Sequence, residues 1–95
     1  MFTGIVEEVG AVSRRSGSDL SILAEVVLEG MRIGDSIAVN GACLTVAAFD
    51  EKGFTAKVAP ETAERTTLGT TRPGDAVNLE RAMAIVDPAQ GSLFG

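Results

Sequence analysis

The chain has 95 residues, with eight Lys and Arg against 13 Asp and Glu, a net charge of −5, and no His. Without His, a Ser–His or Cys–His nucleophile pair and a His-ligated metal are excluded, and a single Cys excludes an internal disulfide and any multi-cysteine metal site. The acidic balance and the absence of Trp and Tyr argue against a surface that binds nucleic acid.

The length suits one domain, and 45% hydrophobic content is typical of a globular chain. No apolar run approaches the ~18 residues of a membrane helix. The chain starts without a basic and apolar signal peptide. We therefore expect a cytoplasmic protein.

Short β-strands separated by polar or glycine-containing turns are predicted along most of the chain. Runs rich in Val, Ile, Leu, Phe and Thr predict strands at residues 5–12, 20–28, 36–39, 42–49, 54–58 and 76–81. Period-two alternation puts one apolar face on the second of them, with Leu20, Ile22, Ala24, Val26 and Leu28. Residues 13–19 and 50–53 are polar turns, and residues 60–64 can start a short helix, because Pro and carboxylates favour a helix amino end.

Two similar turns precede the third and the last strand, with Gly34-Asp35 and Gly74-Asp75. The simpler interpretation is two ordinary turns. Six short strands predict a closed antiparallel barrel or a sandwich, and the barrel is favoured because a small chain cannot easily cover sheet edges otherwise. We assign residues 1–86 to this barrel and residues 87–95, which lack periodicity, to a tail or linker.

Few side chains can carry chemistry. On a strand, Cys43 and Thr45 share one face and could line a small polar pocket, although a buried Cys that acts as a small hydrophobe is the alternative. Gly4 allows close backbone approach to a ligand, or simply forms a turn. Glu61 and Thr62 are further candidates, and their alternative is a solvated helix start.

Four motifs resemble riboflavin synthases. They are Met-Phe-Thr-Gly-Ile-Val-Glu at 1–7, Asn-Gly-Ala-Cys-Leu-Thr-Val at 40–46, Glu-Thr at 61–62 followed by Thr-Leu-Gly at 67–69, and Gly-Asp-Ala-Val-Asn-Leu-Glu-Arg-Ala at 74–82. The resemblance implies an all-β, six-stranded antiparallel Greek-key barrel with one or two short helices. It also implies two tandem barrels in a trimeric family enzyme, which converts two molecules of 6,7-dimethyl-8-ribityllumazine into riboflavin and a pyrimidinedione, with no metal or cofactor.

Within that family the chain is similar to the amino-terminal barrel alone. Residues 83–88 replace a His-containing stretch that leads to the second barrel. We therefore expect lumazine and riboflavin binding with little or no turnover, and a homo-oligomer, as a dimer of the single barrel. The alternatives are a non-catalytic, antenna-type lumazine- or flavin-binding protein, and a barrel used only for oligomer contact.

The resemblance also carries over site residues by position. Cys43 is the candidate catalytic residue. The residues expected to bind the substrate are Phe2, Gly4, Ile5, Val6, Cys43, Leu44, Thr45, Lys57, Val58, Ala59, Pro60, Glu61 and Thr62.

Overall fold

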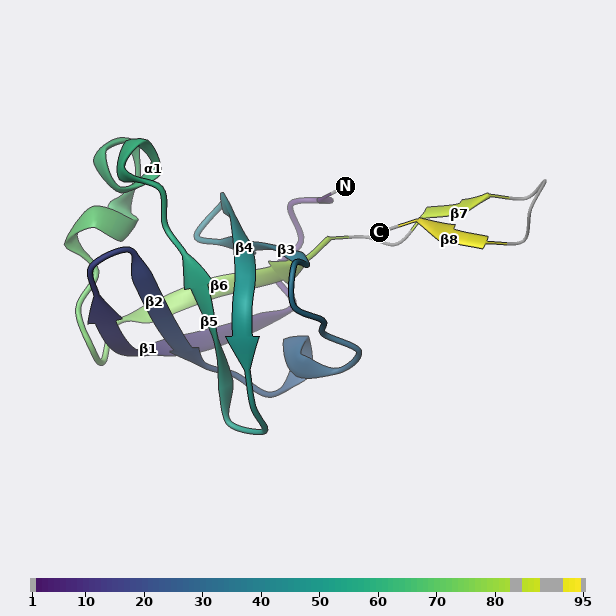
Figure 1. Cartoon of the computed structure of the whole chain (residues 1–95), viewed down its shortest axis with the longest axis horizontal. Coiled ribbons are helices and arrows are strands. Elements are labelled where there is room, and N and C mark those ends of the chain that lie inside the picture. The colour runs from purple at the N-terminus through teal and green to yellow at the C-terminus, as the bar shows by residue number, and fades with distance from the viewer. Residues whose placement is uncertain (1, 83–84, 88–91, 95) are drawn as a thin grey trace.

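A computed structural model describes residues 2–82, 85–87 and 92–94, and its main body is a closed antiparallel barrel (Figure 1). Around the barrel the strands follow the order β1-β2-β5-β4-β3-β6. Their bounds are β1 (Glu8–Ser16), β2 (Asp19–Leu23), β3 (Ser36–Val39), β4 (Ala42–Phe49), β5 (Gly53–Lys57) and β6 (Ala76–Arg81). The predicted all-β six-stranded barrel is confirmed, and β3, β4 and β6 have the predicted bounds.

The barrel is filled by the inward residues of alternating strands. In β4, for example, Leu44 and Val46 are buried while Cys43 and Thr45 are exposed. One continuous core results, whose largest fully buried side chains are Leu20, Ile22, Val27, Ile37, Val39, Val46, Leu68, Val77 and Leu79. The interior therefore holds packed side chains, and any ligand face lies on the outside of the strands.

The predicted second strand is wrong beyond Leu23. The chain there turns into a short 3-10 helix, η1 (Val26–Leu28), so Val27 is fully buried and Val26 is 50% exposed. The cause is the Glu8 carboxylate, which accepts hydrogen bonds from the amides of Glu25 (2.7 Å) and Val27 (3.1 Å). Those donors are satisfied by a side chain, so no strand ladder is needed.

The first strand is also displaced from its prediction at residues 5–12. It begins at Glu8, and it continues to Ser16, so that the turn into β2 is shorter than the polar segment 13–19. Thr3 and Gly4, which precede this strand, lie on the outside of β6 and donate hydrogen bonds to the carboxylate of Glu80.

The two Gly-Asp turns occupy equivalent places in an internally repeated barrel. Strands β1, β2 and β3 form one half of the barrel and β4, β5 and β6 the other. If each strand is replaced by its counterpart in the other half, the pattern of paired strands around the barrel is unchanged. The amide of Gly34 donates to the carbonyl of Val46 in β4 (2.8 Å), and the amide of Gly74 donates to Val12 in β1 (2.7 Å). Both glycines have a positive φ, near 95°. The turns are thus a structural repetition, in which each half of the barrel is fixed to the first strand of the other half.

Two short helices and a hairpin complete the described chain. Helix α1 (Pro60–Arg65) confirms the predicted helix start, and the 3-10 helix η2 (Thr67–Thr70) follows it. The guanidinium of Arg15 donates to the carbonyl of Leu68, whose side chain is in the core. Strands β7 (Ile85–Asp87) and β8 (Ser92–Phe94) form a two-stranded sheet that was not predicted. The proposed boundary at residues 86 and 87 falls within β7 and stays a prediction.

Candidate ligand-binding face

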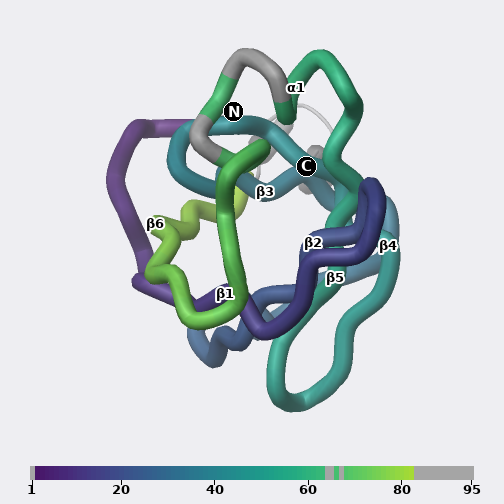
Figure 2. The backbone as a smooth tube through the Cα atoms, turned by 90° about the vertical axis from the view of Figure 1, so that its left-hand side faces the viewer, coloured from purple at the N-terminus to yellow at the C-terminus, as the bar shows by residue number. Residues whose placement is uncertain are grey.

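The three sequence stretches expected to contact a ligand lie on the outside of the barrel, two of them side by side and the third two strands away. They are the amino-terminal segment, the start of β4, and the chain that leaves β5 and enters α1. Figures 1 and 2 both show helix α1 at the upper end of the barrel. Strand β4 starts where β5 ends, because the two are antiparallel and Thr45 is opposite Lys57. Residues far apart in sequence are thus brought to one outer surface.

Cys43 and Thr45 point away from the core. Both are exposed on the outer face of β4, and the inward residue between them, Leu44, is buried. The alternative of a core cysteine is therefore wrong. Leu44 and, at the end of β5, Val58 are core side chains, so any contact that they make with a ligand is through backbone atoms.

The amino-terminal segment is held on the outer face of β6. Glu80 in β6 accepts hydrogen bonds from the amide of Thr3 (2.6 Å), the hydroxyl of Thr3 (2.8 Å) and the amide of Gly4 (3.1 Å). Ala38 of β3 is opposite both Glu80 and Cys43, so the segment lies two strands away from the thiol. Gly4 adopts a φ of 81°, after which Ile5 and Val6 are largely exposed.

The third stretch begins at Lys57, which is exposed and paired with Asp19 of β2. Ala59, Pro60 and Glu61 are exposed at the start of α1, and Thr62 is half-buried. The carbonyl of Thr62 accepts a hydrogen bond from the hydroxyl of Thr66 (2.6 Å). This bond does not use the Thr62 hydroxyl, so that hydroxyl can bond to a ligand while the helix stays intact.

Sequence reasoning missed Ser36. In the β3–β4 register Ser36 is directly opposite Thr45, and it is exposed on the same outer face. The sequence signal that could have found it is the Gly-Asp turn, which fixes where β3 starts and hence which of its residues point outward. Together, the thiol, the two hydroxyls, the Lys57 ammonium and the open backbone at Gly4 can form hydrogen bonds with a polar heterocycle or a polyol.

A cavity lies at the edge of this face. Its volume is about 840 Å³, and among the predicted residues only Ile5 lines it, together with Thr3, Ser36, Glu80 and others of η1, β3 and β6. Cys43, Thr45 and the stretch before α1 lie on open surface instead. The candidate site is the open face, because all of the predicted ligand-contact residues except Ile5 lie outside the cavity walls.

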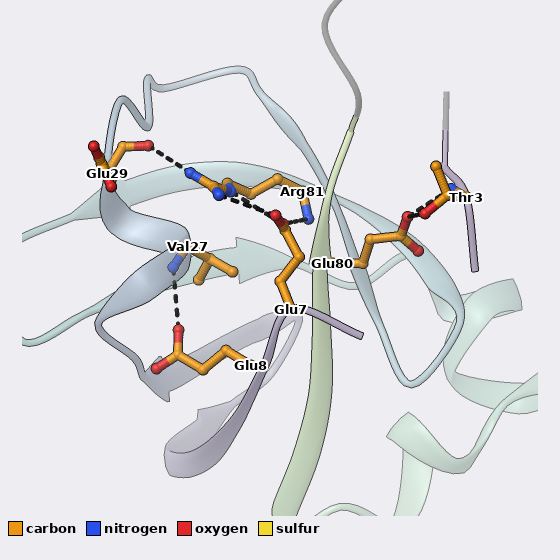
Figure 3. A network of polar contacts seen from close by, with 7 residues as sticks. All are labelled: Thr3, Glu7, Glu8, Val27, Glu29, Glu80 and Arg81. Atoms are coloured by element: carbon orange, nitrogen blue, oxygen red, sulfur yellow. Dashed lines mark hydrogen bonds and ion pairs between the residues drawn. The ribbon is translucent and has the colours of Figure 1, made fainter. Parts of the chain in front are cut away.

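Carboxylates and one guanidinium set the electrostatics at the edge of the face (Figure 3). Burial alone would raise the pKa of Glu80, but the hydrogen bonds from Thr3 and Gly4 outweigh it and hold that pKa below its usual value. The hydrogen bonds from Arg81 lower the pKa of Glu7, and they raise the pKa of Arg81. Both carboxylates are therefore ionised at neutral pH.

Neither a metal site nor a membrane span is evident in the described part of the chain. Among those residues no group of three or more His, Cys, Asp or Glu is placed to hold a metal ion. In the same residues no helix is long and apolar enough to cross a membrane.

The closed barrel, its outward thiol and hydroxyls, and the anchored amino-terminal segment define a small β-barrel domain with a candidate ligand face on its outer surface. Residues 3–82 match the model of the lumazine binding domain family. This match covers most of the chain, and the chain belongs to that family, whose members bind small molecules.

Three similar curated relatives are named riboflavin synthase. The chain is 50% identical over 88 residues to a riboflavin synthase of Actinobacillus pleuropneumoniae, covering 88% of this chain and 41% of the relative. It is 48% identical over 88 residues to a riboflavin synthase of Schizosaccharomyces pombe, covering 87% and 42%. It is 51% identical over 90 residues to a riboflavin synthase of Mycobacterium bovis, covering 90% and 45%. The chain thus spans less than half the length of these relatives.

Proposed function

We propose that this chain is the amino-terminal lumazine-binding barrel of a riboflavin synthase and binds 6,7-dimethyl-8-ribityllumazine and riboflavin. The match to the lumazine binding domain family and the identity of about half to three riboflavin synthases support it. These relatives favour synthase origin over an antenna-type binding protein or a barrel used only for oligomer contact. The observation that carries the proposal is the match of residues 3–82 to the lumazine binding domain family, and the outer face that holds Cys43 and Thr45 beside the end of β5 is the candidate site.

In this proposal each stretch has its own role. Backbone amides and carbonyls at Gly4, Ile5 and Val6 meet the edge of the ring system. Thr45 and Thr62 bond to polar ring atoms or to the ribityl chain, since hydroxyls both donate and accept. Cys43 lies against the reacting ring carbon atoms. No metal or organic cofactor is required, and a cytoplasmic location also stays a prediction.

The face is open, so a single barrel covers only one side of a flat ligand. Ile5 is 69% exposed and Val6 is 47% exposed, and Cys43 and Thr45 are exposed as well. Binding sites for small molecules usually bury ~70–90% of the ligand surface. We therefore propose that a second barrel covers the other side, supplied by another copy when this chain is alone.

Riboflavin titration tests the proposed function. The intrinsic fluorescence of riboflavin is followed as the 95-residue chain is added, and the same titration is repeated with the lumazine. Saturable changes at about one ligand per chain support the proposal. Unchanged fluorescence of both ligands up to high protein concentration contradicts it, and a barrel that serves only oligomer contact then remains as the function.

A further inference from the structure

Glu80 is a buried carboxylate on the outer face of the barrel. The odd-even alternation of β6 puts Ala76, Asn78 and Glu80 on one face; the first two are exposed, whereas Glu80 is only 8% exposed. An outward side chain is buried only where another part of the chain lies over it. Here that part is the amino-terminal segment, whose Thr3 and Gly4 donate to both carboxylate oxygens.

The partners of Glu80 come from this segment and not from a cation. Within the described residues the ion pairs are Lys57–Asp19 and Arg81–Glu7, and Glu80 belongs to neither. A buried carboxylate is costly unless it is hydrogen-bonded, and N–H or O–H donors bind an ionised acceptor about twice as strongly as a neutral one. The carboxylate therefore favours the segment in this one position.

A second anchor lies three residues further along. The amide of Glu7 donates to the carbonyl of Leu79 (2.8 Å), and the Glu7 carboxylate pairs with Arg81. Between the two anchors lie Ile5 and Val6, whose side chains are exposed, and the amide of Ile5 donates to the hydroxyl of Thr3 (3.2 Å). Consecutive residues of β6 thus hold both ends of a short backbone segment, and Figure 3 shows the Glu80–Thr3 and Arg81–Glu7 contacts that do so.

The backbone of residues 4–6 belongs to one of the three stretches expected to contact the ligand. Ordering a flexible residue costs conformational entropy, and a segment that is already ordered avoids this cost when ligand binds. We propose that Glu80 is a positioning residue: it latches Thr3 and Gly4 and thereby pre-orders the backbone of residues 4–6 for the ligand. This inference rests on the proposed function and adds a residue that does not itself contact the ligand.

Glu80→Gln tests the latch. The amide side chain keeps one acceptor oxygen and turns the other into a donor, which then faces an N–H of Thr3 or Gly4. We expect faster hydrogen exchange of the Thr3 and Gly4 amides by NMR, measured without ligand, and riboflavin affinity about tenfold weaker. Glu51→Gln, which removes an exposed carboxylate in the β4–β5 turn, is the matched control and leaves both unchanged.

A double-variant cycle separates positioning from general damage. In a chain that lacks residues 2–4, riboflavin binding is weak, and Glu80→Gln weakens it no further if Glu80 acts through the segment. A full additional loss in that background overturns the inference. Where Glu80→Gln does not fold, Thr3→Ala removes the hydroxyl's bond to Glu80 and the bond that the same hydroxyl accepts from the amide of Ile5. It therefore lowers affinity severalfold, while Thr3→Ser retains both bonds. Equal affinity of Thr3→Ala and the wild type also overturns it.

Failure of the inference and failure of the proposed function give different results. Wild-type chain that binds no riboflavin contradicts the proposed function, and unchanged exchange of the Thr3 and Gly4 amides in Glu80→Gln then contradicts the latch as well. Wild-type chain that binds riboflavin, with Glu80→Gln binding it equally well, contradicts the positioning role alone.

Discussion

Glu7 and Arg81 are joined by three hydrogen bonds across the junction between the amino-terminal segment and β6. Arg81 donates from its amide to Oε1 of Glu7 (2.7 Å), from Nε to Oε1 (3.0 Å) and from Nη2 to Oε2 (2.9 Å). The guanidinium also donates to the carbonyl of Glu29 after η1 (3.1 Å). One pair thus ties together the segment, the last barrel strand and the loop behind η1.

The Glu7–Arg81 pair predicts a pH-dependent stability. Arg81 lowers the pKa of Glu7 in the folded state, so the pair stabilises the fold at pH values above the unfolded pKa, near ~4.3. This contribution is lost as the pH falls through the lower, folded pKa. Both side chains are about one-third exposed, so we expect Glu7→Gln to cost about 0.5–1 kcal/mol at pH 7.

Urea unfolding of the wild type and Glu7→Gln at a series of pH values measures this effect. The difference in unfolding free energy should shrink toward zero as the pH falls below about 4. A difference that is constant over the whole range would show that the substitution acts through packing rather than through the charge of Glu7.

Neighbouring residues of β4 give a second prediction. Cys43→Ser changes an exposed side chain, so we expect the unfolding free energy to stay within about 0.5 kcal/mol of the wild type while riboflavin affinity falls. Leu44→Ala, one residue along and only 3% exposed, should cost about 2–5 kcal/mol because it leaves a cavity in the core. Thermal melts and riboflavin titration compare the two. An unfolded Cys43→Ser chain would contradict the outward assignment.

Strand positions with strong alternation were predictable from the sequence, and the rest depended on distant groups. The bounds of β3, β4 and β6 follow from their apolar spacing. The end of β2 does not, because the Glu8 carboxylate that diverts residues 25–27 comes from another strand. The common face of Cys43 and Thr45 was predictable, but alternation alone cannot say whether that face is inside or outside.

The same reasoning explains which site residues were missed. Ser36 joins the face only through the β3–β4 register, which is set by turns outside both strands. Glu80 looks like an ordinary surface carboxylate in the sequence, because its partners Thr3 and Gly4 lie more than 70 residues away. Contacts of this separation leave no local pattern in a single sequence.

A third prediction concerns Thr62 at the start of α1. We expect Thr62→Ala to weaken riboflavin binding by up to about tenfold, since one hydrogen bond contributes roughly 0.5–1.5 kcal/mol. Its carbonyl, which accepts from Thr66, is retained in the variant, so α1 should stay formed. Thr62→Ser is the control and should bind nearly as well as the wild type. Equal binding by the alanine variant would remove Thr62 from the site.

The repeated turns yield a fourth prediction. Oδ2 of Asp35 accepts from the amide of Arg32 (2.8 Å), and Oδ2 of Asp75 accepts from the amide of Arg72 (2.9 Å). Because the two corners are equivalent, Asp35→Ala and Asp75→Ala should each cost about 1 kcal/mol. The Asn variants retain an acceptor oxygen and should lose less. Urea unfolding measures all four, and a large loss at one corner only would contradict the equivalence.

The last prediction is that the 95-residue chain pairs with itself and turns over the lumazine slowly or not at all. In the proposed function the chemistry needs two lumazines face to face, one as donor and one as acceptor. A single barrel presents one open face, so the opposing face has to come from another copy, and closed two-fold pairing is the commonest arrangement. Sedimentation velocity with and without riboflavin should then show a dimer with about one ligand per chain.

Pairing of identical faces also sets the expected rate. The two ligand sites of such a dimer are equal, whereas donor and acceptor have to be held differently. Correct orientation of reactants can supply ~7–11 kcal/mol of rate acceleration, so an imperfect pairing geometry removes most of the activity. Absorbance-monitored conversion of the lumazine measures it against a full-length riboflavin synthase. A chain that stays monomeric with riboflavin bound contradicts the pairing, and conversion at the full-length rate contradicts the need for a second, different barrel.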